Sequence, residues 1–312
     1  MESILSVTFI VGVLSAMLRI ATPLILGTIG ELFNERAGIL NLGIEGIVTF
    51  GAMSAFIITL FTGNAYLGIL VAMVCGILLS LLMGFLTVTL RLDQDVCGLG
   101  LLFLASGLSY FIYRLAVGIQ PVPPTIQNFS ALQIPLLSNI PYLGEILFKQ
   151  YSLFYIAILL IPLSQFILYK THFGLNIRSC GENPAAADTM GVNVTRTRYQ
   201  SLAIGGALFG LAGAYFTVFQ MNIFIFGMVA GRGIVCIALV VFGNWKPVKC
   251  FLGALLFAFI DAFQLRLQHI GLQVPYQFFL LLPYLFTVIV LVLAARGAVY
   301  PQALLKPYSR ED

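Results

Sequence analysis

Long apolar runs separated by short polar stretches occupy almost the whole chain. Because about 20 mostly apolar residues are needed to cross the hydrocarbon core of a bilayer, each such run is a candidate transmembrane helix. The clear candidates are Ile4–Ile20, Ile39–Phe61, Ala65–Leu90, Val96–Val117, Tyr151–Tyr169, Tyr199–Gln220, Phe224–Gly243, Phe251–Leu265 and Pro275–Ala295. The pattern predicts an all-α, polytopic transmembrane bundle that forms a single domain over residues 1–312.

A tenth, shorter run, Thr22–Phe33, opens with Pro23 and contains Gly27 and Gly30. Apolar periodicity does not distinguish a short span from a re-entrant half-helix at such a run. With ten spans, the long Pro-rich loop 118–150 divides the chain into five plus five segments, which points to an inverted repeat. We therefore predict about ten segments, with nine as the alternative.

The positions of lysine and arginine predict the topology. Eleven are assigned to one side: Arg36, Arg91, Lys170, Arg178, Arg196, Arg198, Lys246, Lys249, Arg296, Lys306 and Arg310. Four are assigned to the other: Arg19, Arg114, Lys149 and Arg266. The positive-inside rule then places loop 170–198 and the C-terminus in the cytoplasm and loop 118–150 outside, in a bacterial cell membrane. The N-terminus has no basic region before Ile4–Ile20, so we expect that helix to be retained.

Composition narrows the class of protein. Hydrophobic residues make up 60% of the chain and charged residues 9%, against about 25% charged in an ordinary soluble domain. Too few charges remain to cover a soluble enzyme or to bind nucleic acid, and the net charge is only +4. No P-loop motif is present to bind ATP phosphates. The five cysteines lack metal-ligand spacing, and we interpret them as small hydrophobic residues.

A glycine-rich segment from Gly30 to Gly46 carries unusual polar residues. Asn41 and Glu45 are four residues apart and would share a helix face. A carboxylate within a span is costly unless it is paired or hydrated, so Glu45 should face the bundle interior or an aqueous cavity. The segment is either part of a solute pathway or gate, or a polar clasp between helices.

Loop 170–198 contains the signals of a short helix. Asn183 is a good N-cap, Pro184 suits the first helical position, and Gly191 suits the stop. The small side chains between them would let another protein approach closely. The helix is therefore either a docking site or an ordinary connector.

Arg232 stands between Gly231 and Gly233 at the start of an apolar run. It could face a cavity, pair with Glu45 or Asp261, or extend to the membrane interface. We take Asn41, Glu45, Arg232 and Asp261 as candidates for the translocation path, and the single tryptophan, Trp245, as an interface anchor.

Three stretches together resemble the permease subunits of ABC importers for branched-chain amino acids, ribose and nucleosides. They are Gly38-Ile-Leu-Asn-Leu-Gly-Ile-Glu-Gly46, Gly181-Glu-Asn-Pro-Ala-Ala-Ala-Asp-Thr-Met-Gly191, and the stretch from Gly231-Arg-Gly to Phe242-Gly-Asn-Trp-Lys-Pro247. The sequence of residues 34–46 is most similar to that of the nucleoside branch, whose members work with basic membrane lipoproteins.

The resemblance implies a subunit without catalytic activity or a cofactor of its own. ATP would be hydrolysed by separate ABC ATPase subunits. A paralogous permease would complete the pathway as a heterodimer, and an extracytoplasmic lipoprotein would deliver the solute. The coupling helix that contacts the ATPase would comprise Gly181, Glu182, Asn183, Pro184, Ala185, Ala186, Ala187, Asp188 and Gly191.

Two kinds of alternative accompany this interpretation. The importer could carry a sugar or an amino acid instead of a nucleoside. The chain could also be an ion-coupled secondary transporter that uses Glu45 or Asp261 as its proton site, or a structural subunit.

Overall fold

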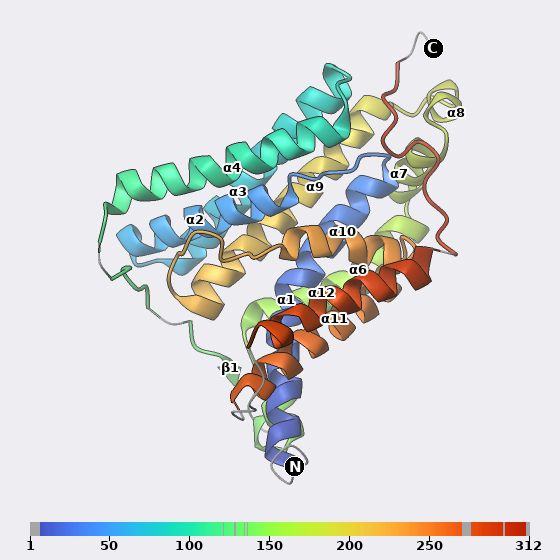
Figure 1. Cartoon of the computed structure of the whole chain (residues 1–312). Helices are drawn as coiled ribbons and strands as arrows, with labels where there is room; N and C mark the ends of the chain where they lie inside the picture. Colours follow the sequence, from blue (N-terminus) through green and yellow to red (C-terminus); the bar gives the residue numbers. More distant parts are fainter. Residues whose placement is uncertain are drawn as a thin grey trace.

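The computed structural model describes residues 7–120, 122–127, 129–133, 135, 137–269, 276–295 and 297–309. Within them the chain is a bundle of helices (Figure 1). The helices are α1 Val7–Arg36, α2 Ile44–Thr62, α3 Ala65–Gly84, α4 Gln94–Val117, α5 Leu143–Leu147, α6 Ser152–Lys170, α7 His172–Glu182, α8 Pro184–Thr189, α9 Val194–Ala214, α10 Arg232–Phe242, α11 Pro247–His269 and α12 Tyr276–Ala295. Two π-helices, η1 Phe85–Thr89 and η3 Tyr215–Met221, extend α3 and α9.

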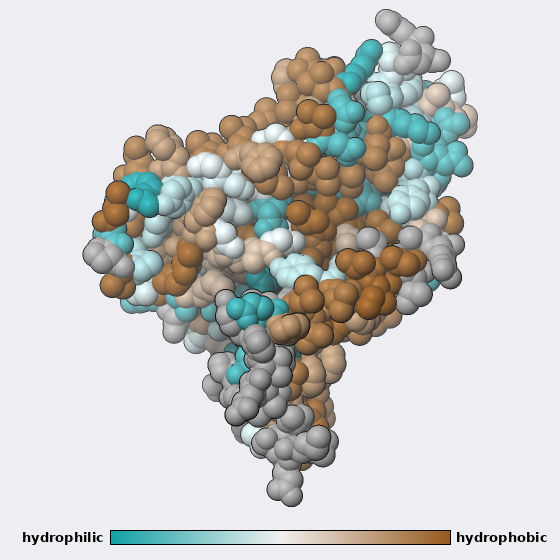
Figure 2. Space-filling model, in the orientation of Figure 1, coloured by the Kyte–Doolittle hydropathy of each residue, from teal (hydrophilic) through white to brown (hydrophobic). Residues whose placement is uncertain are grey.

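The fold is that of a multi-pass membrane protein. Seven helices among the described residues are long and apolar enough to cross a membrane. Their outward faces carry large apolar side chains, such as Tyr66 on α3 and Phe103 on α4, each 71% exposed. In water such exposure would be unfavourable, whereas in lipid it is the expected arrangement. Figure 2 shows the apolar surface over most of the molecule and a polar region at the end that holds α8 and the C-terminal segment.

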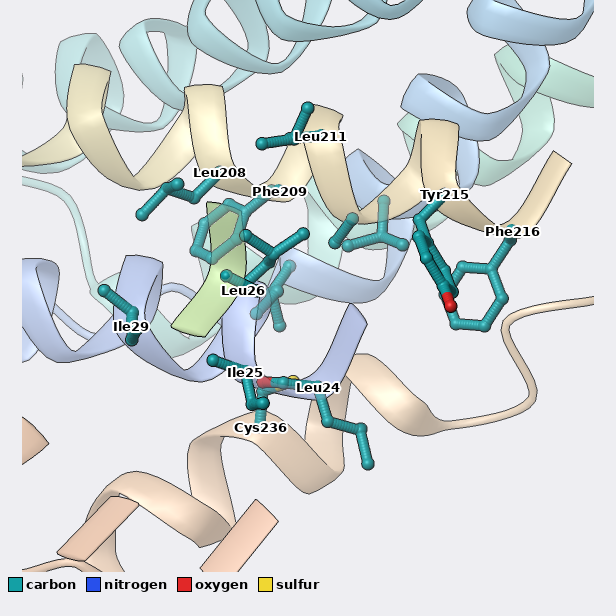
Figure 3. Packing of buried hydrophobic residues seen from close by; sticks show 14 of the residues in the cluster. Leu24, Ile25, Leu26, Ile29, Leu208, Phe209, Leu211, Tyr215, Phe216 and Cys236 are labelled. Carbon is teal, nitrogen blue, oxygen red and sulfur yellow. The ribbon is translucent and has the colours of Figure 1, made fainter. Parts of the chain in front are cut away.

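Helices α1 and α9 form the centre of the bundle. Leu26 of α1 lies beside Phe209 of α9, and Leu24 and Ile25 of α1 lie beside Cys236 of α10 (Figure 3). All five side chains are buried. The middle turns of α1 and α9 are apolar on every side because other helices surround them.

Small residues allow α3 and α9 to pack backbone against backbone. A Cβ atom added at Gly76 would overlap the Gly206 carbonyl oxygen, and one at Gly210 would overlap the Ala72 carbonyl oxygen. Without a hydrophobic driving force in lipid, such close packing is what holds helices together. The large residues of α3 therefore face outward and its small ones face inward.

The two halves of the chain are interlocked. Helix α1 packs against α10 and α11 of the second half, and α9 packs against α2 and α3 of the first half. Each half thus contributes one long helix that packs within the other half.

The all-α polytopic prediction is confirmed, but three predicted segments differ. Ile4–Ile20 and Thr22–Phe33 are not separate spans, because a single helix, α1, runs through Pro23 from Val7 to Arg36. At 1.5 Å per residue, α1 is about 45 Å long. The predicted span Phe224–Gly243 is helical only from Arg232, so α10 is about 16 Å long and crosses only half a bilayer. With α10 and α12 included, the described residues contain nine apolar segments, of which seven are long and apolar enough to span a membrane.

The long loop 118–150 carries the small ordered elements. Leu132–Gln133 (β1) and Lys149–Gln150 (β2) form a two-residue antiparallel ladder. A short 3-10 helix, η2 Leu137–Asn139, precedes α5. Gln150 is buried, and its amide donates to the Ser15 hydroxyl oxygen on α1 at 3.2 Å. The loop is thereby attached to the N-terminal part of α1.

Candidate functional site

The Glu45 carboxylate joins the first turns of α2 and α10. Glu45 lies in the first turn of α2. Its two oxygens accept hydrogen bonds from the backbone N–H groups of Gly231, at 2.7 Å, and Gly233, at 2.6 Å. Both N–H groups belong to the start of α10, where they have no partner within the helix. The carboxylate thus lies between two positive helix ends and stabilises both.

The glycines around Arg232 make this approach possible. Gly231 has a φ of +80°, which other residues rarely adopt. A Cβ atom at Gly233 would come within 2.7 Å of the Glu45 side chain. The Gly-Arg-Gly sequence therefore forms a socket for the carboxylate.

Arg232 forms an ion pair with Asp261, which is one of the alternatives that the sequence left open for it. The guanidinium Nη2 lies 3.2 Å from Asp261 Oδ2, and the other Asp261 oxygen accepts from the Gln264 amide at 3.0 Å. The Arg232 guanidinium carbon is also 5.7 Å from the centre of the Phe216 ring. Arg232 therefore forms its ion pair with Asp261, whereas backbone amides bind Glu45.

Asn41 does not share a helix face with Glu45, because α2 begins only at Ile44. Gly38, with a φ of +87°, ends the preceding turn, and residues 37–43 form a loop. The Asn41 side chain accepts from its neighbour Gly43 N–H at 3.1 Å, while its own N–H donates to Glu31 Oε1 at 2.8 Å. Asn41 shapes the loop before α2 rather than extending that helix.

A buried polar cluster at the end of α1 lies within the segment Gly30–Gly46, for which the sequence left a polar clasp between helices as one alternative, although these residues were not among the named candidates. Glu31, Asn34 and Glu35 are all fully buried. Asn34 donates to Glu31 at 3.0 Å, and the Trp245 indole N–H donates to Glu35 at 2.6 Å. The sequence signal for this buried cluster is the presence of two carboxylates within an apolar helix. Among the described residues, no group of three His, Cys, Asp or Glu could hold a metal ion.

Trp245 is not an interface anchor, because its side chain is fully buried. Its carbonyl oxygen accepts from two nitrogens of the Arg36 side chain, at 3.1 and 2.9 Å. The turn between α10 and α11 is therefore fixed to the end of α1 by both its side chain and its backbone.

The predicted short helix is present as α8. The Asn183 side chain accepts from Ala186 N–H at 3.0 Å, and Pro184 is the first helical residue. Gly191 has a φ of +85°, as a stop signal requires. The preceding helix, α7, was not predicted, and the next helix is capped by Asn193, whose side chain accepts from Arg196 N–H at 2.8 Å.

Helix α8 has one face against the protein and one face exposed. Ala187 is 4% exposed and packs with Cys180 and Val194. Ala185 and Ala186 are exposed, and the Met190 side chain that follows is 84% exposed. The outer face of α8 and the Met190 side chain are therefore both accessible.

A chain of contacts connects α8 to the Glu45 socket. Gly181, just before α8, touches the end of α1 so closely that a Cβ atom there would overlap the Arg36 carbonyl oxygen. Arg198 of α9 is buried and donates from Nε to the Ala37 carbonyl oxygen at 3.2 Å. Ala37 begins the loop that leads to Glu45. The end of α7, the end of α1 and the loop that leads to Glu45 are therefore in direct contact.

These features define a membrane transport subunit: a lipid-facing bundle with interrupted helices at its centre and an exposed helix at one end. Comparison with known proteins agrees. The chain belongs to the family described as "branched-chain amino acid transport system / permease component", whose profile matches residues 13–295.

Several curated proteins are similar over nearly their full length. A nucleoside ABC transporter permease protein of Lactococcus lactis is 38% identical, over 93% of this chain and 94% of that protein. A guanosine ABC transporter permease protein of Bacillus subtilis is 36% identical, over 95% and 96%. A putative glucose ABC transporter permease protein of Haloferax volcanii is 37% identical, over 97% and 99%. No solved structure matches the chain.

Proposed function

We propose that this chain forms part of the translocation pathway of an ATP-driven importer for a nucleoside. The central observation is the junction at which α2 and α10 begin, held by the Glu45 carboxylate. Two helices that start inside the bundle leave a boundary that can open without breaking a long helix. In transporters such interruptions lie at solute pathways.

The few charges at this junction are already paired or hydrogen-bonded within the chain, which suits an uncharged solute. Arg232 faces Asp261, and Glu45 is bound by backbone amides. Neither carboxylate has the unpaired setting that a proton site in a secondary transporter would favour. This observation and the family membership support the importer over the ion-coupled alternative.

Partner proteins follow from the same interpretation. ATPase subunits bind the exposed face of α8 in the cytoplasm, where the C-terminus also lies. A paralogous permease completes the pathway, and a binding lipoprotein delivers solute on the opposite side. The polar end of the molecule around α8 (Figure 2) supports this orientation because it carries exposed cations such as Arg196 and Lys306.

Nucleoside and guanosine transport are named for two of the relatives, and glucose for a third. The test is uptake of labelled nucleoside into vesicles that contain the assembled transporter. ATP-dependent uptake that excess unlabelled nucleoside suppresses, and excess glucose does not, would support the proposal. ATP-dependent uptake of labelled glucose without uptake of labelled nucleoside would identify a sugar importer, and uptake by this chain alone under a proton gradient would refute the importer.

The docking role of α8 is tested by Ala186→Trp. Ala186 is exposed, so an indole there should be tolerated by the fold but should obstruct a partner. We expect the ATPase to be lost from the purified complex while the melting temperature of the permease stays the same. Undiminished co-purification would exclude docking at this face.

A further inference from the structure

The C-terminal segment, residues 297–309, lies across α7 and α8 at the polar end of the molecule (Figure 1). The Ala303 N–H donates to the Gly181 carbonyl oxygen at 2.8 Å, directly before α8. On the other side of the segment, the Ala303 carbonyl oxygen lies against Gly38, where an added Cβ atom would come within 3.1 Å of it. Ala303 is only 4% exposed. The segment is therefore packed between α8 and the loop that leads to Glu45.

A second contact holds α8 itself. The Tyr308 hydroxyl donates to Asp188 Oδ2 at 3.0 Å, and the Tyr308 ring packs against the cluster of Cys180, Ala187 and Val194. A helix of six residues is not stable alone, because the cost of forming the first turn exceeds what so few hydrogen bonds return. The orientation of α8 therefore depends on this packing.

The segment also borders an open groove of about 630 Å³ beside α8. Its walls include Arg91 after α3, Asp188 and Gly191 at α8, Arg196 on α9, and Tyr308. Arg91 and Arg196 are exposed, and the Asp188 carboxylate accepts a hydrogen bond from Tyr308. The charged lining residues are thus two arginines and one aspartate, with the exposed Lys306 on the segment that borders the groove and Met190 next to Gly191 in the chain.

We propose that the C-terminal segment and α8 form one composite docking surface for the ATPase subunit, with the segment bordering the groove and Tyr308 setting the orientation of α8. The proposal rests on the proposed function and deepens it. The partner surface would carry acidic side chains toward Arg91, Arg196 and Lys306, and an apolar socket for Met190. A concave groove beside an exposed apolar side chain fits a protein surface better than a flat layer of anionic lipid headgroups.

Photo-cross-linking in the assembled transporter tests the surface directly. The photoreactive residue p-benzoylphenylalanine replaces Lys306 in one variant, Met190 in a second, and Gln120 in a third. Met190 already carries a large exposed side chain directly after α8, and Gln120 is exposed in the loop after α4 and serves as the control. We expect cross-links to the ATPase from positions 306 and 190 and none from position 120.

The outcomes separate this inference from the proposed function. Cross-links from position 190 but not 306 would overturn the composite surface and leave docking at α8 intact. Cross-links from neither position would contradict both proposals. Cross-links from position 306 only to lipid would show that the segment binds the membrane surface instead.

Tyr308→Phe tests the positioning role, because it removes the hydroxyl and keeps the ring. The matched control is Tyr300→Phe, on the same segment, where the ring packs 4.7 Å from that of Trp245. We expect Tyr308→Phe to weaken ATPase binding about tenfold, through loss of one hydrogen bond to a carboxylate. The melting temperature should fall only slightly, because α8 and the C-terminal segment lie at the edge of the bundle and open locally. Equal ATPase affinity of Tyr308→Phe and Tyr300→Phe would refute the positioning role.

Discussion

Replacing Glu45 with glutamine removes the charge between α2 and α10 and preserves the size of the side chain. The carboxylate accepts from Gly231 N–H at 2.7 Å and from Gly233 N–H at 2.6 Å. A glutamine can accept from one of them through its oxygen, but its NH₂ group then faces the other N–H, donor against donor. A hydrogen bond to a charged group contributes about 1.5–3 kcal/mol, so the loss of one should cost about 2 kcal/mol.

For a protein of this size, that cost corresponds to a fall of about 4 °C in melting temperature. The assay is thermal unfolding of the purified permease in detergent, together with ATP-dependent uptake by the assembled transporter. The control is Glu145→Gln, which neutralises an exposed carboxylate in loop 118–150. We expect Glu45→Gln to lower both the melting temperature and the uptake, and the control to change neither. A Glu45→Gln variant that melts and transports like the control would refute the reasoning.

Two further predictions concern packing and the ion pair. Asp261→Asn should destabilise the protein by about 1–3 kcal/mol, because the Arg232 guanidinium loses its counter-charge 3.2 Å away. Thermal unfolding is measured for Asp261→Asn, for Arg232→Gln and for the double variant, which should lose less stability than the sum of the two single variants. Strictly additive losses would show that the two side chains do not interact. Gly210→Ala should lower the melting temperature, because the added methyl group forces α9 away from α3. The control is Gly107→Ala on α4, where an added Cβ meets nothing within 4 Å, and it should leave the melting temperature equal or higher. Equal effects of the two substitutions would contradict the close α3–α9 contact.

The helical content, the membrane setting and most spans were predictable from sequence, since apolar length alone is diagnostic of a membrane helix. The α8 caps, Asn183 and Gly191, were predictable for the same local reason: capping depends on neighbours within a few residues. Thr22–Phe33 was interpreted as a separate segment because Pro23 usually ends a helix. Inside a bundle, neighbouring helices compensate for the missing hydrogen bond, and α1 continues.

The interaction partners of the polar residues were harder to predict from the sequence. Sequence identified Glu45, Arg232 and Asp261 as unusual, because a charge in an apolar run is costly wherever it lies. It left open which would pair, since Glu45 is 186 residues from Gly231 along the chain. It also misjudged Trp245, whose aromatic character fits a membrane interface and a buried cluster equally well.

Local sequence therefore determined what each segment is: its length, its caps, its apolar character and the presence of charges that need compensation. Only the tertiary structure decided which segments meet, because packing between helices depends on side-chain shape at positions far apart in the chain. The exchange of α1 and α9 between the halves, the Glu45 socket at the start of α10, and the C-terminal segment against α8 are all contacts of that kind.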